Sequence, residues 1–293
     1  MNQNLKLLCA AKINLCLDIT GKRPDNYHTL KSIFQSVSVY DRLEITLRDG
    51  NGVSLTCDAP GVPCDESNLA CKAAELFLEY AGIKADVHIH LEKKIPSGAG
   101  MGGGSADAAG VLYALNQLLN CHYENAELRE LGVKLGADVP FMLMGGTALA
   151  EGIGEVLKKL PSLPELPLVI LKGEQSVSTP AAYRAIDALV NPVHPDTETL
   201  LKAVTSRNID VLYHHCANLF ESVIDLPEVR NAENKLLENG AECAVMTGSG
   251  AAVFGIFKEA QKAQACAEKL KSEFAFVQAC HTTEQPFLII QEG

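Results

Sequence analysis

Several signals that would place this chain at a membrane or on nucleic acid are missing. No apolar run is long enough to span a bilayer, and the N-terminal residues lack the block form and cleavage site of a signal peptide. The 36 aspartates and glutamates outnumber the 25 lysines and arginines, which gives a net charge of −11 and leaves no basic stripe. We therefore expect a cytoplasmic protein with no nucleic acid and no membrane as a partner.

Paired cysteine motifs are also missing. The ten cysteines include no C-x-x-C, and their spacing does not match a zinc site. Scattered cysteines in a chain of 293 residues are mostly reduced core residues. Hydrophobic residues make up 47% and charged residues 21%, which is ordinary for a globular protein. The length of 293 residues is compatible with two lobes or with one large α/β domain.

The most informative segment is a glycine cluster, in which five of the seven positions from 98 to 104 are glycine. An alternating strand pattern over 87–91 precedes it, and an Ala- and Leu-rich helical run over 105–119 follows it. Glycine permits close backbone approach and positive φ, and the free N–H groups that begin a helix favour an anion. The pattern predicts a phosphate-binding loop rather than a linker, which would be polar throughout.

Two common phosphate loops do not fit this cluster. A P-loop requires Lys-Ser or Lys-Thr after its last glycine, whereas Gly104 is followed by Ser-Ala. The dinucleotide pattern G-x-G-x-x-G can be placed on Gly98, Gly100 and Gly103, but residues 115–120 contain no carboxylate to bind a ribose.

The rest of the chain predicts a mixed order of strands and helices, and hence an α+β class. We expect strands at 5–19, 30–40, 43–47, 87–91, 168–171, 243–246, 252–256 and 286–291. We expect helices at 68–82, 105–119, 125–135, 181–190, 197–205, 228–238 and 259–272. Three prolines within 161–167 exclude regular structure there and predict a boundary that divides the chain into domains 1–160 and 161–293.

Three motifs, taken in order, resemble those of the GHMP kinases, named for galacto-, homoserine, mevalonate and phosphomevalonate kinases. They are the lysine-bearing strand segment 11–15, the loop 96–106 with Met101 in the usual leucine place, and the glycine turn 247–251. The resemblance spans nearly the whole chain. It implies a two-lobed α+β fold of mixed sheets with helices packed against them, and places ATP and substrate in the cleft between the lobes.

Within the family, segments 21–30 and 135–141 resemble members whose small-molecule substrate carries a cytidine diphosphate group. The resemblance implies ATP-dependent phosphorylation of a hydroxyl of that substrate, in the synthesis of isoprenoid precursors. Asn26 stands where the family usually has glycine, and this departure is small because Asn tolerates left-handed φ better than most residues.

The resemblance assigns the ATP phosphates to eleven consecutive residues. These are Pro96, Ser97, Gly98, Ala99, Gly100, Met101, Gly102, Gly103, Gly104, Ser105 and Ala106. Mg²⁺ is expected as a second cofactor, because ATP chemistry of this class uses it to neutralise the β- and γ-oxygens. The Ser105 hydroxyl is the candidate metal ligand.

Lys12 and Asp138 are the candidate catalytic residues. From the residues alone, Asp138 could equally be a helix cap, because Asp before Val-Pro suits a helix start. Lys12 would ordinarily be a solvated strand lysine, although its apolar neighbours imply a buried charge that needs a partner. The resemblance pairs the two residues, with Asp138 accepting the alcohol proton and Lys12 keeping that carboxylate ionised.

A further set of residues is assigned to substrate binding: Asn14, Tyr27, His28, Thr179, Tyr183, Gly248, Ser249 and Gly250. Tyr27 can stack on a pyrimidine and His28 can bond its polar edge, although an ordinary surface turn is the simpler interpretation without the resemblance. Asn14 is assigned to substrate hydroxyls, and the two residues near 180 complete the site from the second lobe. The turn at 248–250 offers backbone N–H groups to the diphosphate, with a plain hairpin turn as the alternative.

Two alternative functions remain at this point. One is another small-molecule GHMP kinase, or a decarboxylase that phosphorylates before losing CO₂. The other is a non-catalytic nucleotide-binding protein, against which the presence of both Lys12 and Asp138 argues, since a pure binder needs no proton acceptor. The sequence leaves open whether the protein is a monomer or a homodimer.

Overall fold

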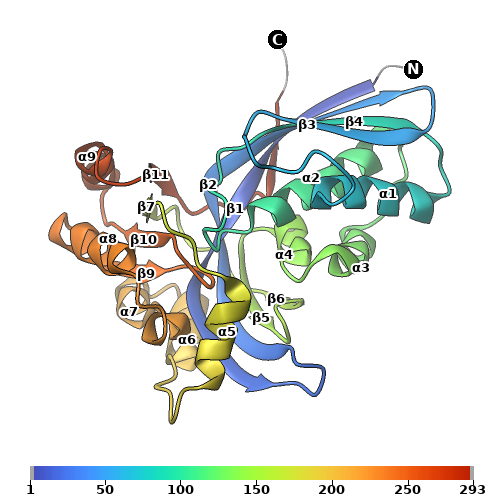
Figure 1. Cartoon of the computed structure of the whole chain (residues 1–293). Coiled ribbons are helices and arrows are strands. Elements are labelled where there is room, and N and C mark those ends of the chain that lie inside the picture. The colour runs from blue at the N-terminus through green and yellow to red at the C-terminus, as the bar shows by residue number, and fades with distance from the viewer. Residues whose placement is uncertain (1–2, 291–293) are drawn as a thin grey trace.

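The computed structural model describes residues 3–290 and consists of two sheets with helices packed against them (Figure 1). The larger sheet has the order β12-β1-β2-β4-β3, with β5 and β6 attached to β2 and with β8 attached to β1. Its strands are β1 (Gln3–Lys22), β2 (His28–Arg48), β3 (Gly52–Cys57), β4 (Asp86–Glu92), β5 (Thr147–Glu151), β6 (Val156–Lys159), β8 (Ala217–Asn218) and β12 (Phe287–Ile289).

The smaller sheet is antiparallel and has the order β11-β7-β10-β9. Its strands are β11 (Phe276–His281), β7 (Pro167–Lys172), β10 (Val253–Ile256) and β9 (Cys243–Met246). Two helices, α8 (Pro227–Glu238) and α9 (Ala260–Leu270), pack against it. The α+β class is confirmed.

Two long strands form the centre of the molecule. β1 and β2 pair antiparallel over most of their length, with register shifts next to Ala11, Asn14 and Gly21. Residues 9–19 of β1 are all buried, so this strand is covered on both faces. Lys12 and Asn14 stand two residues apart and project from one face.

Four helices gather on one side of the larger sheet (Figure 1). They are α1 (Leu69–Ala81), α2 (Gly103–Leu118), α3 (Asn125–Leu135) and α4 (Val139–Met144). α2 packs against both β1 and β2, and its Gly110 lies directly over Cys9 and Leu43. The first turn of α2 is thereby held at a fixed place beside β1.

α6 (Thr197–Ser206) and α7 (Ile209–His215) lie on the opposite side of β1 and β2 in the view of Figure 1. The other two helical segments are α5 (Thr179–Asp187) and the short 3₁₀ helix η1 (Leu219–Ser222). β8 and β12, both from beyond residue 160, pair with β1 and therefore join the first sheet. The division into domains 1–160 and 161–293 stays a prediction.

The predicted elements differ from the structure in several places. The strands expected at 30–40 and 43–47 form one strand. The carboxylate of the intervening Asp41 accepts hydrogen bonds from the Lys94 and Ile95 N–H groups and is therefore tolerated within it. Pro167 begins β7 rather than a structureless segment, and the first position of a strand tolerates proline. The last strand is shorter than expected, and position 291 lies outside the described residues. β3, β5, β6, β11, α4 and α7 were not predicted.

None of the helices within residues 3–290 combines the length and the apolar character that crossing a membrane requires. All ten cysteines are free thiols, and five of them are buried. The expectation of unpaired cysteines is confirmed.

Replacement of Gly110 tests the packing of α2 on the sheet. A Cβ at this position would lie 2.5 Å from Cys9 Sγ and 2.8 Å from Leu43 Cδ2, both of which are buried. We expect Gly110→Ala to lower the free energy of unfolding by about 1–3 kcal/mol, measured by urea denaturation. Gly104→Ala in the first turn is the control, because its Cβ would lie 3.7 Å from Leu69 Cδ1 and alanine favours a helix. Equal stability of the two variants would contradict this packing.

Candidate active site

Three adjoining cavities contain most of the residues that the sequence singles out. A first cavity of about 490 Å³ is lined by ten residues of the glycine loop (residues 96–106) and by residues 61–63 and 67–69. A second cavity of about 200 Å³ contains Lys12 and Asp138 and shares Gly100 and Gly102 with the first. A third, of about 540 Å³, contains His28 and shares lining residues on α5 with the second. The three cavities are therefore neighbours in one cleft.

The glycine loop leads directly into α2. Gly98, Gly100 and Gly102 have φ values of 61°, 73° and 72°, which side chains rarely adopt. Gly102 is the N-cap of α2 and offers no side-chain cap, so the first N–H groups of the helix are left for another acceptor. Ten of the eleven predicted loop residues line the first cavity, whereas Ala106 is buried in the core.

The glycine turn (residues 247–251) packs backbone to backbone against this loop. A Cβ on Gly100 would lie 2.9 Å from the Thr247 carbonyl carbon, and a Cβ on Gly248 would lie 2.7 Å from Gly100 Cα. The Ala251 N–H donates to the Gly98 carbonyl at 3.3 Å. The turn and the loop therefore form adjoining walls of the cleft.

Asn14 on β1 ties the lysine to the glycine turn. Its Oδ1 accepts from Lys12 Nζ at 2.8 Å and from the Gly248 N–H at 2.9 Å, and its Nδ2 donates to Ser32 Oγ at 2.8 Å. Asn14 is buried and lines the second cavity. Its bonds give it a structural role, and its contact with substrate stays a prediction.

Lys12 and Asp138 face the same cavity. Lys12 is only 4% exposed and its Nζ lies 5.0 Å from the ring centre of Phe34. Burial lowers the pKa of Lys12, and the charge of Asp138 opposes this effect. Asp138 occupies the N-cap position of α4, yet its side chain makes no cap hydrogen bond. The carboxylate therefore does not cap α4.

The third cavity is organised around His28. Its Nε2 lies 2.7 Å from Asp187 Oδ1, and its ring stacks on Tyr183 with centroids 4.6 Å apart. Tyr27 is 61% exposed beside it, and Asn26 takes a φ of 68°, as expected for a residue in place of glycine. Sequence reasoning missed Asp187, because no local pattern relates α5 to a turn that lies 159 residues away.

Among the remaining substrate candidates, Thr179 lines both the second and the third cavity, whereas Gly248 and Ser249 line the second alone. Thr179 Oγ1 and Ser249 Oγ are 2.7 Å apart, which joins the start of α5 to the glycine turn. Gly250 is not among the residues that line the described cavities. A Cβ there would lie 2.8 Å from Met246 Sδ, on the buried side of the turn.

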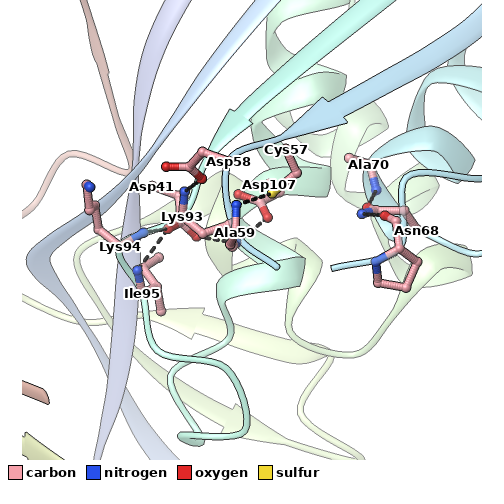
Figure 2. A network of polar contacts seen from close by, with 11 residues as sticks. Asp41, Cys57, Asp58, Ala59, Asn68, Ala70, Lys93, Lys94, Ile95 and Asp107 are labelled. Carbon is pink, nitrogen blue, oxygen red and sulfur yellow. Dashed lines mark hydrogen bonds and ion pairs between the residues drawn. The ribbon is translucent and has the colours of Figure 1, made fainter. Parts of the chain in front are cut away.

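Sequence reasoning also missed a polar network beneath the glycine loop, shown in Figure 2. Lys93 Nζ bonds both Asp41 on β2 and Asp107 on α2. Asn68, the N-cap of α1, accepts from the Ala70 N–H at 2.9 Å. Lys93, Asp107 and Asn68 all line the first cavity.

Comparison with known proteins decides the family. The family pattern described as GHMP kinases N terminal domain matches residues 68–146, and the pattern described as GHMP kinases C terminal matches residues 193–275. The two matches together cover more than half of the chain. The chain belongs to the GHMP kinase family. The resemblance inferred from its three motifs is thereby confirmed.

Curated relatives of this GHMP kinase align with almost all of it. A 4-diphosphocytidyl-2-C-methyl-D-erythritol kinase of Clostridium botulinum (strain Eklund 17B / Type B) is 43% identical over 91% of this chain and 96% of the relative. A kinase of the same name from Caldicellulosiruptor bescii is 41% identical over 91% of this chain and 94% of the relative.

Solved structures agree with these alignments. A crystal structure of 4-(cytidine 5'-diphospho)-2C-methyl-D-erythritol kinase gives a TM-score of 0.81 at 35% identity, over 97% of this GHMP kinase and 100% of that chain. Homoserine kinase from Cytophaga hutchinsonii gives 0.80 at 22% identity, over 98% and 97% of the two chains. The second likeness shows the fold alone.

A half-buried carboxyl supports the glycine turn of this GHMP kinase. Glu221 Oε1 on η1 accepts from the Met246 N–H at 2.6 Å, one residue before the turn. Burial raises the pKa of Glu221 to about 8, although the Met246 bond opposes the shift and Glu233 on α8 adds to it. The folded protein therefore keeps this carboxyl protonated at neutral pH.

The substitution Glu221→Gln tests whether this carboxyl is protonated, through the dependence of the unfolding free energy on pH. Between the ordinary pKa of 4.5 and about 8, the folded state holds a proton that the unfolded chain releases, so stability falls as pH rises through this window. The neutral glutamine does not lose stability in this way. We therefore expect the difference in unfolding free energy, variant minus unaltered protein, to increase by on the order of 2 kcal/mol from pH 6 to pH 9. Glu238→Gln, an exposed substitution on α8, is the control. A difference that does not change with pH would contradict a buried proton on Glu221.

Proposed function

We propose that this GHMP kinase transfers the γ-phosphoryl group of ATP to the 2-hydroxyl of 4-diphosphocytidyl-2-C-methyl-D-erythritol, in the non-mevalonate route to isoprenoid precursors. The observation that carries the proposal is the cleft in which a glycine loop, a Lys–Asp pair and a histidine-centred pocket follow one another. The names of the relatives at 41–43% identity support the same substrate.

ATP occupies the first cavity in this proposal. Its phosphates lie against the glycine loop, where the uncapped N–H groups at the start of α2 stabilise negative charge. Its base lies against residues 61–63 and 67–69, which form another wall of that cavity. This arrangement explains how a protein with a net charge of −11 binds a polyanion without a basic surface.

Mg²⁺ fits the same cavity as an ion delivered with the nucleotide. No group of three or more acidic, histidine or cysteine side chains within residues 3–290 is arranged to hold a metal. Mg²⁺ commonly keeps its waters and binds substrate phosphates with few protein ligands, so the Ser105 hydroxyl lining the cavity suffices as a protein ligand. Bound there, the ion neutralises charge on the β- and γ-oxygens.

The Lys–Asp pair prepares the alcohol in the second cavity. Asp138 accepts the proton of the attacking hydroxyl, and its freedom from capping leaves its oxygens available for this task. The buried Lys12 ammonium keeps Asp138 ionised and stabilises the charge that develops on the transferred group. The surrounding cavity holds the hydroxyl in line with the phosphate.

The third cavity recognises the cytidine. Tyr27 and Tyr183 provide ring faces for stacking, and His28 provides a hydrogen-bonding edge held in place by Asp187. The N–H groups of the glycine turn, with Thr179 beside it, face the diphosphate of the substrate.

The remaining expectations stay part of the proposal. The protein acts in the cytoplasm as a monomer or homodimer, on a small molecule and without a nucleic acid or membrane partner. The negative net charge supports this, because it disfavours both polyanions and anionic lipid surfaces.

Release of ADP tests the function directly. The assay follows ADP formation with MgATP alone, with the cytidylated substrate, and with homoserine or mevalonate. Release that depends on the cytidylated substrate supports the proposal. Release with another alcohol favours a different GHMP kinase, and nucleotide binding without turnover favours a non-catalytic protein.

Lys12→Met tests the catalytic lysine, because methionine keeps the packing on Phe34 and removes the charge. We expect kcat to fall by at least about 100-fold while the KM for ATP stays within about threefold. Lys172→Met is the matched control, since Lys172 is also buried but bonds only the Gly173 and Gln175 carbonyls among its described contacts. Unchanged turnover in Lys12→Met would refute the role.

His28→Ala tests base recognition. We expect the KM for the cytidylated substrate to rise at least about tenfold, while the KM for ATP changes little, as steady-state kinetics with each substrate varied would reveal. His90→Ala is the control, because His90 lies on β4 and bonds Thr56 rather than the cleft. An equal rise in both KM values would refute a role in cytidine recognition.

A further inference from the structure

A buried amide side chain is bonded to the glycine turn. Asn218, at the end of β8 and beside β1, is only 4% exposed. Its Oδ1 accepts from the Phe220 N–H at 3.0 Å, and its Nδ2 donates to the Met246 and Gly248 carbonyls at 2.7 and 2.8 Å. Both amide hydrogens are used, and the bond to Phe220 determines which end of the amide faces the turn. Aspartate has the same shape but offers these carbonyls no donor.

Gly248 is flanked by two peptide groups, and a different side chain holds each of them. Asn14 Oδ1 accepts from the Gly248 N–H at 2.9 Å, which fixes the peptide group before Gly248. Asn218 bonds the Gly248 carbonyl, which belongs to the peptide group after it. Because glycine restricts its own backbone torsions less than any other residue does, the orientation of this second peptide group depends on Asn218.

The second peptide group also contains the Ser249 N–H. The Gly248–Ser249 bond is trans, so its carbonyl and its N–H point in opposite directions. Asn218 bonds the carbonyl and lines none of the three cavities, whereas Ser249 lines the second cavity. The bond to Asn218 therefore directs the Ser249 N–H away from Asn218, to the side of the turn that borders the second cavity.

The Ser249 N–H is available to a ligand. Within residues 3–290 it has no hydrogen-bond acceptor, whereas the other N–H groups of segment 247–252 are bonded. Their acceptors are Asn14 Oδ1 and the carbonyl oxygens of Gly98, Ala99, Thr247 and Ala252. The hydroxyls of Ser249 and Thr179 lie 2.7 Å apart on the same cavity. One N–H and two hydroxyls at one place suit an oxygen of a phosphate.

We propose that Asn218 is a positioning residue, which holds the Gly248–Ser249 peptide group so that its N–H donates to an oxygen of the substrate diphosphate. This inference rests on the proposed function, in which the substrate lies in the second and third cavities. The donor is in place before the substrate binds, so the peptide group does not have to be reoriented on binding. An aspartate at 218 would set a carboxylate against two carbonyl oxygens, and their repulsion would turn the peptide group away from this orientation.

Calorimetry with two ligands tests the inference without catalysis. Cytidine 5′-diphosphate carries the diphosphate and cytidine lacks it, so only the first can accept from the Ser249 N–H. In Asn218→Asp we expect the Kd of cytidine 5′-diphosphate to rise at least about tenfold, while the Kd of cytidine stays within about twofold. A general loss of structure would weaken the binding of both ligands alike.

Asn116→Asp is the matched control. Asn116 on α2 is also buried, and its amide bonds both the N–H and the carbonyl of Tyr123 at 3.0 Å. The substitution removes a buried donor in the same way, at a residue that lines none of the three cavities, so we expect both Kd values to stay unchanged. Asn218→Ser removes the donor without adding a charge, and it replaces Asn218→Asp if that variant does not fold.

The outcomes separate this inference from the function on which it rests. An unchanged Kd for cytidine 5′-diphosphate in the Asn218 variants, or an equal loss for both ligands, overturns the inference and leaves the proposed function standing. Unaltered protein that binds neither ligand overturns the proposed function and the inference with it.

NMR of the unaltered protein decides the inference even where neither variant folds. We expect the Ser249 amide proton to shift downfield when cytidine 5′-diphosphate binds, because a hydrogen bond to an anionic oxygen forms, and to stay in place when cytidine binds. The same position of this resonance with both ligands overturns the inference.

Discussion

The contact between two glycine backbones is the constraint on which the whole cleft depends. Gly100 of the glycine loop and Gly248 of the glycine turn meet so closely that a side chain on either would strike main-chain atoms of the other segment. Main-chain atoms cannot move aside by changing a rotamer, so both positions require glycine. The loop and the turn lie far apart in the sequence, and their contact brings the first cavity beside the second.

Two lysines that lie beside these cavities are already engaged with other side chains. Lys12 is engaged with Asn14, and Lys93 is engaged with two carboxylates. Neither lysine is a free surface cation, so in the proposed function the main-chain N–H groups at the start of α2 provide most of the attraction for the nucleotide. The buried lysines interact instead with carboxylates that lie beside the cleft, Lys93 with Asp41 and Asp107 and Lys12 with Asp138.

The sequence predicted those elements whose formation depends on residues that are near one another in the chain. The alternation of β4 and the glycine that ends α1 in a left-handed conformation were visible in the sequence. β11 was not, because it is defined by pairing with β7 more than 100 residues earlier. The predicted strands leave a break at residues 41–42, and the distant segment 93–95, which donates three hydrogen bonds to the Asp41 carboxylate, explains why that carboxylate is tolerated there. Asp187 escaped notice for the same reason, whereas the glycine loop, Lys12 and Asp138 were named from their motifs and their roles stay proposals.

Asn14 connects the two ends of the proposed reaction. Its Oδ1 accepts from both Lys12 Nζ and the Gly248 N–H, so one amide sets the place of the ammonium and of the turn. Asn218 holds the turn from its other side, donating to the Met246 and Gly248 carbonyls at 2.7 and 2.8 Å. A ligand that displaces the turn must therefore change the hydrogen bonding of Lys12. In the proposed function, binding of the substrate diphosphate at the turn is thereby coupled to the electrostatics of proton transfer at Asp138.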